Sequence, residues 1–211
     1  MINDSSFIFL AILGFSLPYL NLFSDQASNI IATIPNSEEV ARWTKAGFSQ
    51  TIKTNEIELP FEDLTIDRAL LIHAVEHSES IQPMMREIWR VLSNNGRIII
   101  LVPNRRGIWA RMESTPFGSG RPYSLSQLTN LLKDTLFTPL TKGAALYMPP
   151  SNSQMLISAT PILEKLGQRW FGGLGNVLGG VISIEAIKQI YAPTETLKAS
   201  NRQQYVIVTN Q

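Results

Sequence analysis

The sequence predicts an α/β fold in which helices cover a doubly wound, mostly parallel sheet. Short apolar runs rich in β-branched residues alternate along the chain with segments of helical periodicity. Such alternation is typical of βαβ units, which build parallel sheets. The clearest strand, Arg97–Val102, reads RIIILV, and a continuous apolar run is expected of a parallel strand that is buried on both faces.

Composition fits one globular domain. The 211 residues are 44% hydrophobic and 17% charged, which allows a sizeable core and argues against disorder. The net charge is +1, so no strong field is available to hold nucleic acid or an anionic membrane, and we expect neither partner. The absence of cysteine excludes disulfides, zinc–thiolate sites and cysteine nucleophiles. We expect a cytoplasmic protein with a single domain over residues 1–211.

The apolar run Phe7–Phe23 admits three interpretations. A signal-peptide core is disfavoured because the preceding Met-Ile-Asn-Asp carries no basic residue and no small-x-small cleavage site follows. A membrane span is disfavoured because the run contains Gly14 and Pro18 and is shorter than the ~20 residues that a span needs. We favour a buried strand at Phe7–Leu13, followed by a turn.

The remaining elements follow from periodicity and capping. A helix capped by Ser80 has the buried face Met84, Met85, Ile88, Val91 and Leu92, and it should stop at a left-handed Gly96. A second helix, capped by Ser124, carries Leu125, Leu128, Leu131, Leu132 and Leu136. A third helical pattern covers Met155–Phe171, with a break at Pro161. Further strands are expected at Asn29–Ile34, weakly at Thr51–Lys53, and at Ala69–Ile72, Ala144–Met148 and Val181–Ile184.

One stretch carries a combination of short motifs. They are Asn55-Glu56-Ile57-Glu58-Leu59-Pro60-Phe61, Ile66-Asp67-Arg68-Ala69-Leu70-Leu71, Val75-Glu76-His77, Met85-Arg86-Glu87-Ile88-Trp89-Arg90-Val91-Leu92 and Asn95-Gly96-Arg97-Ile98-Ile99-Ile100. In this order they resemble the class I, Rossmann-like S-adenosylmethionine-dependent methyltransferases of the small-molecule type. The similarity is close over about fifty residues and looser over most of the chain.

The resemblance implies S-adenosylmethionine as cofactor and methyl transfer to a small molecule. It implies a cofactor half at about 1–104, a substrate loop with the last strands at about 105–195, and a tail at 196–211. Ligands in such sheets lie outside the carboxyl ends of the strands. The resemblance assigns Gly14 and Ser16 to the first turn and Asn55, with Glu56 beside it, to the adenine end. It puts Ile72 and His73 near the sulfonium.

The departures from the family pattern are concentrated at the first turn, which usually reads acid-x-Gly-x-Gly-x-Gly. Here Ile12, Ser16 and Pro18 replace the acid and two glycines, so only Gly14 remains. The ribose-binding acid after the second strand is also absent from Thr33-Ile34-Pro35. Because the family's helical segment before the first strand is missing, either the domain is truncated or that strand is misassigned.

These departures motivate a second hypothesis, a non-catalytic relative that acts as a binding or regulatory protein. A third class, a nucleotide-dependent dehydrogenase, is disfavoured because a lone Gly14 does not make Gly-x-Gly-x-x-Gly.

Several side chains with useful chemistry follow the predicted strands. His73 is a candidate general base, against the alternative of an ordinary loop histidine. A metal site at His73, Glu76 and His77 would need a helix, whereas a strand ends here. Arg105 and Arg106 are candidates to bind a carboxylate or phosphate of the acceptor, and Tyr123 to line the same site. The sequence names neither the acceptor nor the oligomeric state.

Overall fold

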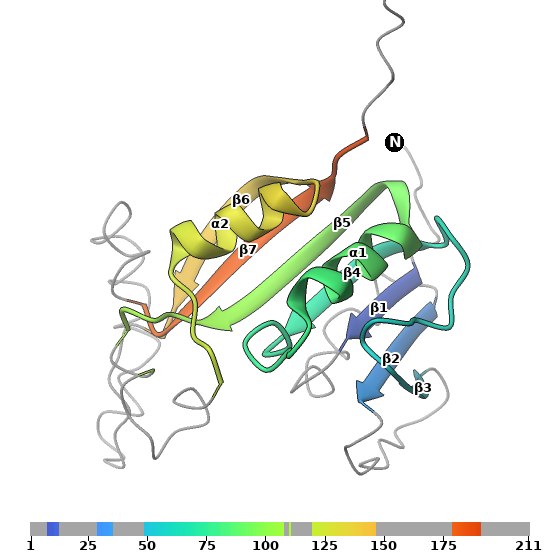
Figure 1. Cartoon of the computed structure of the whole chain (residues 1–211), viewed down its shortest axis with the longest axis horizontal. Coiled ribbons are helices and arrows are strands. Elements are labelled where there is room, and N and C mark those ends of the chain that lie inside the picture. Colours follow the sequence, from blue (N-terminus) through green and yellow to red (C-terminus); the bar gives the residue numbers. More distant parts are fainter. Residues whose placement is uncertain are drawn as a thin grey trace, which may run out of the picture.

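The computed structural model describes residues 8–12, 29–35, 49–107, 110, 120–146 and 179–190. These residues form a seven-stranded sheet of order β3-β2-β1-β4-β5-β7-β6 (Figure 1). The strands are β1 (Ile8–Ile12), β2 (Asn29–Pro35), β3 (Ser49–Thr54), β4 (Ile66–Ile72), β5 (Leu92–Pro103), β6 (Phe137–Ala145) and β7 (Val181–Lys188). The described helices are α1 (Ile81–Val91) and α2 (Leu125–Asp134).

The strand order confirms the predicted fold class. Strands β1 to β5 pair in parallel, and only β7 runs antiparallel to its neighbours, β5 and β6. The chain winds outward from β1 to β3 and then returns to β4 on the other side of β1. The sheet is therefore doubly wound, with its topological switch point between β1 and β4, where such folds bind ligands.

The amino-terminal apolar run contributes an inner strand to the sheet. Residues Ile8–Ile12 form β1 between β2 and β4, which confirms the strand interpretation for this part of Phe7–Phe23. The rest of that run lies outside the described residues. In the described part of the chain, no helix is long and apolar enough to cross a bilayer.

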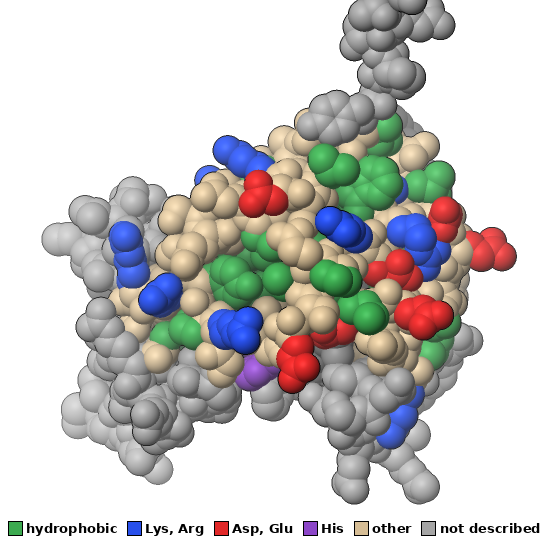
Figure 2. Space-filling model, viewed as in Figure 1, with side chains coloured by type: hydrophobic (Ala, Val, Ile, Leu, Met, Phe, Trp, Pro, Cys, Tyr) green, Lys and Arg blue, Asp and Glu red, His purple; other side chains and the backbone are tan. Residues whose placement is uncertain are grey.

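Both described helices lie on the same face of the sheet (Figure 1). The predicted apolar faces are buried: α1 contributes Met84, Met85, Ile88 and Val91, and α2 contributes Leu128, Leu131 and Leu132. These side chains join Ile98 and Ile100 of β5 in one hydrophobic cluster. Outside the core, basic and acidic side chains are interspersed over this helical face (Figure 2).

The carboxyl end of α1 differs from the prediction. The helix ends at Val91, and Leu92 is already extended (φ −68°, ψ 136°) and begins β5. Gly96 does not adopt the left-handed conformation. A Cβ there would lie 2.9 Å from the Ser93 carbonyl oxygen and 3.0 Å from the Leu92 Cβ. Close packing, rather than a helix cap, therefore makes a glycine necessary.

The prediction was also wrong at the end of α2. The helix begins as expected, because Ser124 and Gln127 form a reciprocal capping box. It ends at Asp134, where the Thr135 hydroxyl donates to the Leu131 carbonyl (2.7 Å). Leu136 then takes a left-handed φ of 64° and is 39% exposed, so it does not belong to the buried face.

The sheet's last strands begin and end elsewhere than predicted. β6 overlaps the expected strand at 144–148 only over its last two residues, and β7 extends the expected strand at 181–184 to Lys188. The predicted helix at 155–171 lies outside the described residues.

Buried Lys188 donates to the Leu92 carbonyl (2.7 Å), and its ammonium lies 4.0 Å from the Trp89 ring centroid. Burial lowers the pKa of this ammonium. This contact joins β7 to the α1–β5 junction.

Candidate functional site

The parallel strands end together at one edge of the sheet. Their register pairs Ile12 with Thr33, Pro35 with Thr54, and Ile72 with Leu101. The loops after β1 to β5 therefore emerge on the same side. This is the edge where the sequence predicts ligand binding.

The loop after β4 begins with a strained histidine. His73 has a left-handed φ of 57°, and its amide donates to the Leu101 carbonyl (3.0 Å). Its Nδ1 lies 2.7 Å from Glu76 Oε1. The Glu76 side chain is only 1% exposed, and its Oε2 has no hydrogen-bond partner among the described residues. Non-glycine residues in this backbone region are uncommon and gather at functional sites.

The predicted adenine-end residues lie in the loop after β3. Asn55 is exposed, and its Oδ1 accepts a hydrogen bond from the Ile57 amide (3.3 Å). Glu56 Oε1 accepts from the Ser78 hydroxyl (2.7 Å), which links this loop to the one after β4. The structure therefore brings the Asn55–Glu56 turn next to the loop that begins with His73.

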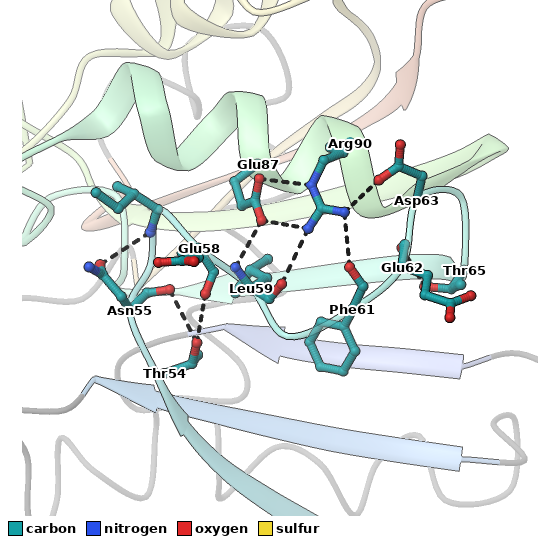
Figure 3. Close-up of polar contacts among 11 residues, drawn as sticks. Thr54, Asn55, Glu58, Leu59, Phe61, Glu62, Asp63, Thr65, Glu87 and Arg90 are labelled. Carbon is teal, nitrogen blue, oxygen red and sulfur yellow. Dashed lines mark hydrogen bonds and ion pairs between the residues drawn. The ribbon is translucent and has the colours of Figure 1, made fainter.

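An arginine clamp holds the Leu59-Pro60-Phe61 turn against α1 (Figure 3). Arg90 donates to the Leu59 carbonyl (3.2 Å) and the Phe61 carbonyl (2.9 Å), and Glu87 Oε1 accepts from the Leu59 amide (2.8 Å). Glu87 and Asp63 each lie 2.6 Å from the Arg90 guanidinium. Hydrogen bonds from Arg90 lower the pKa of Glu87, and those acids raise the pKa of Arg90.

The segment at 120–123 is hydrogen-bonded to the loop after β4 and to the end of β5. The Arg121 amide donates to the Glu76 carbonyl (2.8 Å), and the Tyr123 amide donates to the Pro103 carbonyl (3.1 Å). The Arg105 amide donates to the Tyr123 carbonyl (2.9 Å). Burial raises the pKa of Tyr123, with a smaller contribution from the Glu76 carboxylate and an opposing one from Arg121. Tyr123 is thus near both Glu76 and Arg105.

Asn104 organises the turn after β5, a role that the sequence analysis did not assign. It is buried, its Nδ2 donates to the Gly179 carbonyl (2.7 Å), and its Oδ1 accepts from the Arg106 amide (3.1 Å). The exposed Arg105 and Arg106 therefore leave the sheet from a fixed turn. An asparagine directly after a buried strand was the available signal, because its side chain commonly bonds the backbone two residues on.

Two of the predicted cofactor-binding residues, Gly14 and Ser16, lie outside the described residues. The β2 end Thr33-Ile34-Pro35 lies at the same edge and carries no acid. Where the structure describes the chain, no three His, Cys, Asp or Glu side chains gather as a metal site would require. His77 is exposed, unlike the neighbouring His73–Glu76 pair.

Solved structures share this fold. A putative methyltransferase of Haloferax volcanii, solved in complex with the Trm112 methyltransferase activator, aligns with a TM-score of 0.65 at 13% identity, over 91% of this chain and 86% of that one. A possible histamine N-methyltransferase of Thermotoga maritima aligns at 0.60 and 17%, over 85% and 81%. The 1,6-didemethyltoxoflavin-N1-methyltransferase of Burkholderia thailandensis, with S-adenosylhomocysteine bound, aligns at 0.57 and 15%, over 88% and 72%.

The chain thus has the fold of these methyltransferases. Residues 13–100 of the chain match the model of the methyltransferase-domain family. An uncharacterized protein of Methanocaldococcus jannaschii is 39% identical over 54 residues, which are 26% of this chain. The match spans 24% of that curated relative's length.

Proposed function

We propose that the chain transfers a methyl group from S-adenosylmethionine to a small molecule at the common edge of β1 to β5. The observation that carries the proposal is the convergence of three loops there. Glu56 is bonded to Ser78, the Arg121 amide to the Glu76 carbonyl, and the Arg105 amide to the Tyr123 carbonyl. A site built from several loops at the switch point suits a ligand that spans the edge.

The residues at this edge fit the cofactor. Exposed Asn55, with Glu56 beside it, would bind the adenine end, since an amide oxygen has a second lone pair for the adenine amine. Buried Ile72 and the backbone of His73 would line the sulfonium region. Gly14 and Ser16 would form the turn beside the methionine part. When bound, S-adenosylmethionine supplies an electrophilic methyl group on sulfur.

The methyl acceptor would lie on the side of His73 that faces away from the cofactor. Arg105 and Arg106 would bind a carboxylate or phosphate on it, and Tyr123 would line its pocket. His73 would take the proton that the acceptor loses. For the rest, the protein has to hold donor and acceptor in line, and orientation alone can lower a barrier by about 7–11 kcal/mol.

Calorimetry of the purified chain with S-adenosylmethionine and S-adenosylhomocysteine tests the proposal. We expect saturable heat with both compounds and none with NAD⁺, which would be bound by a dehydrogenase. A folded, monodisperse sample that binds neither compound at millimolar concentration would instead favour the non-catalytic relative. That alternative is motivated by Ile12, Ser16 and Pro18 at the first turn and by the absent acid at the end of β2.

A further inference from the structure

We infer that Glu76 is a positioning residue for His73, and that it fixes the imidazole in the tautomer with the proton on Nδ1. The inference rests on the proposed function, because it assigns a partner to the proposed base. It comes from a contact between two side chains of one loop, in which Glu76 Oε1 lies 2.7 Å from His73 Nδ1.

The hydrogen-bond chemistry of the pair determines the tautomer. An ionised carboxylate only accepts hydrogen bonds, so the proton between the two groups belongs to Nδ1. The neutral ring then has its basic lone pair on Nε2. A histidine base held in one tautomer by a carboxylate needs no rotation or proton exchange before it acts.

The backbone holds both members of the pair in place. The His73 amide bonds to the Leu101 carbonyl (3.0 Å) despite the left-handed φ of 57°. The Glu76 carbonyl accepts from the Arg121 amide (2.8 Å). A Cβ at Gly120, which has a φ of 79°, would lie 2.8 Å from that same carbonyl oxygen. Glu76 therefore ties the proposed base to the segment proposed to carry the acceptor pocket.

Packing alone does not explain a carboxylate here. Glu76 is 2% exposed, and its Oε2 has no hydrogen-bond partner in the described part of the chain. Leaving a buried polar atom unpaired costs free energy, so an apolar side chain of similar volume would fill this position better. The bond to His73 accounts for a carboxylate at this position.

Nitrogen NMR of the histidine side chains tests the inference directly. His73 and His77 are the only histidines of the chain, so a His77→Asn background leaves a single imidazole. Long-range ¹H–¹⁵N spectra are recorded at increasing pH until the two ring ¹⁵N shifts no longer change, which identifies the neutral ring. We expect protonated Nδ1 and unprotonated Nε2 at His73. The opposite tautomer in this parent chain would overturn the inference without any further variant.

Two substitutions of Glu76 separate positioning from packing. Glu76→Met keeps the length of the side chain and removes the acceptor, so the Nε2–H tautomer should become the major form. Glu76→Gln retains an acceptor oxygen and should preserve the Nδ1–H tautomer. Unchanged spectra in Glu76→Met would show that another group fixes the ring, which would contradict the inference. Thermal melting of both variants confirms that they fold.

Cofactor titration distinguishes this inference from the proposed function. Glu76→Met should bind S-adenosylhomocysteine within about twofold of the parent, because the residue acts on the base. If the parent chain does not bind the compound, the proposed function fails while the tautomer result still stands. Once an acceptor is known, kcat should fall at least tenfold in Glu76→Met, with the 10²–10⁴-fold contribution of general-base catalysis as the upper limit, and it should recover in part in Glu76→Gln.

Discussion

The contact between Gly120 and the Glu76 carbonyl leaves no room for a side chain. Gly120→Ala should cost about 1–3 kcal/mol, because it combines a left-handed backbone with a Cβ placed 2.8 Å from a backbone oxygen. Gly143→Ala is the matched control: its Cβ would meet only the rotatable Ser183 Oγ (2.7 Å). Urea unfolding measures both. Equal losses in the two variants would show that the Glu76 contact is not special.

Arg106 gives a second test at the scale of one residue. If it binds an anionic acceptor, Arg106→Ala should raise the acceptor's KM by about tenfold or more and leave cofactor affinity unchanged, as loss of ground-state binding does. The Asn104 side chain bonds to Arg106 through the Arg106 backbone amide, so the turn should survive the substitution. Steady-state kinetics measure the effect. An unchanged KM in both Arg105→Ala and Arg106→Ala would remove the pair from the site.

At the scale of elements, the clamp between α1 and the Leu59-Pro60-Phe61 turn is open to direct test. Arg90→Met should cost about 1.5–3 kcal/mol, because it leaves the Leu59 and Phe61 carbonyls and the Glu87 carboxylate without their charged donor. Asp63→Asn is the control, since Asp63 is 72% exposed and should change stability by less than about 0.5 kcal/mol. Urea denaturation at pH 7 compares them.

The same clamp should make stability depend on pH. Folding lowers the pKa of Glu87 below its ordinary 4.5, so its contribution is present above that pH and is lost as the pH falls through the folded pKa. Glu87→Gln should therefore lower stability at pH 7 and flatten the decline below pH 4.5. Denaturation curves from pH 7 to pH 3 measure this slope. A parallel decline in both proteins would contradict the role given to Glu87.

An element could be predicted from the sequence when a local pattern of apolar residues determines it. The inner parallel strands and both helices were predictable because burial leaves a local apolar pattern, whereas the edge strand β3 was expected only weakly. β6 was mostly missed, because it is an edge strand whose Thr138, Thr141 and Lys142 are exposed and interrupt that pattern. Gly96 was misread because glycine suits both a helix cap and close packing, and only tertiary structure distinguishes the two.

The candidate site was predictable only in part for a related reason. The positions of Asn55, His73, Arg105 and Tyr123 at one edge followed from the strand order. The contacts that organise the site join residues far apart in sequence, such as Glu76 with Arg121, and no local pattern reports them. The roles of all these residues remain predictions.

For the whole molecule, the altered first turn predicts weak cofactor binding. The missing ribose acid removes a charge-assisted hydrogen bond worth roughly 1.5–3 kcal/mol, or about one to two decades of affinity. Relative to a micromolar binder, the dissociation constant should fall between tens of micromolar and millimolar. Gly14→Val should abolish the remaining binding, since a branched side chain would block the methionine end. Calorimetry measures the dissociation constant of the parent chain and the loss of binding in Gly14→Val. Sub-micromolar binding by the parent chain would refute this reasoning.

The inner position of β7 has a consequence for synthesis of the protein. β7 comes last among the described strands, yet it lies between β5 and β6. Until residues 181–188 leave the ribosome, β5 and β6 cannot be joined, and each presents an unpaired edge. Unpaired edges promote association between chains. A nascent chain stalled before Val181 should therefore be aggregation-prone, and chaperones that bind exposed strands should act on it at this stage of translation.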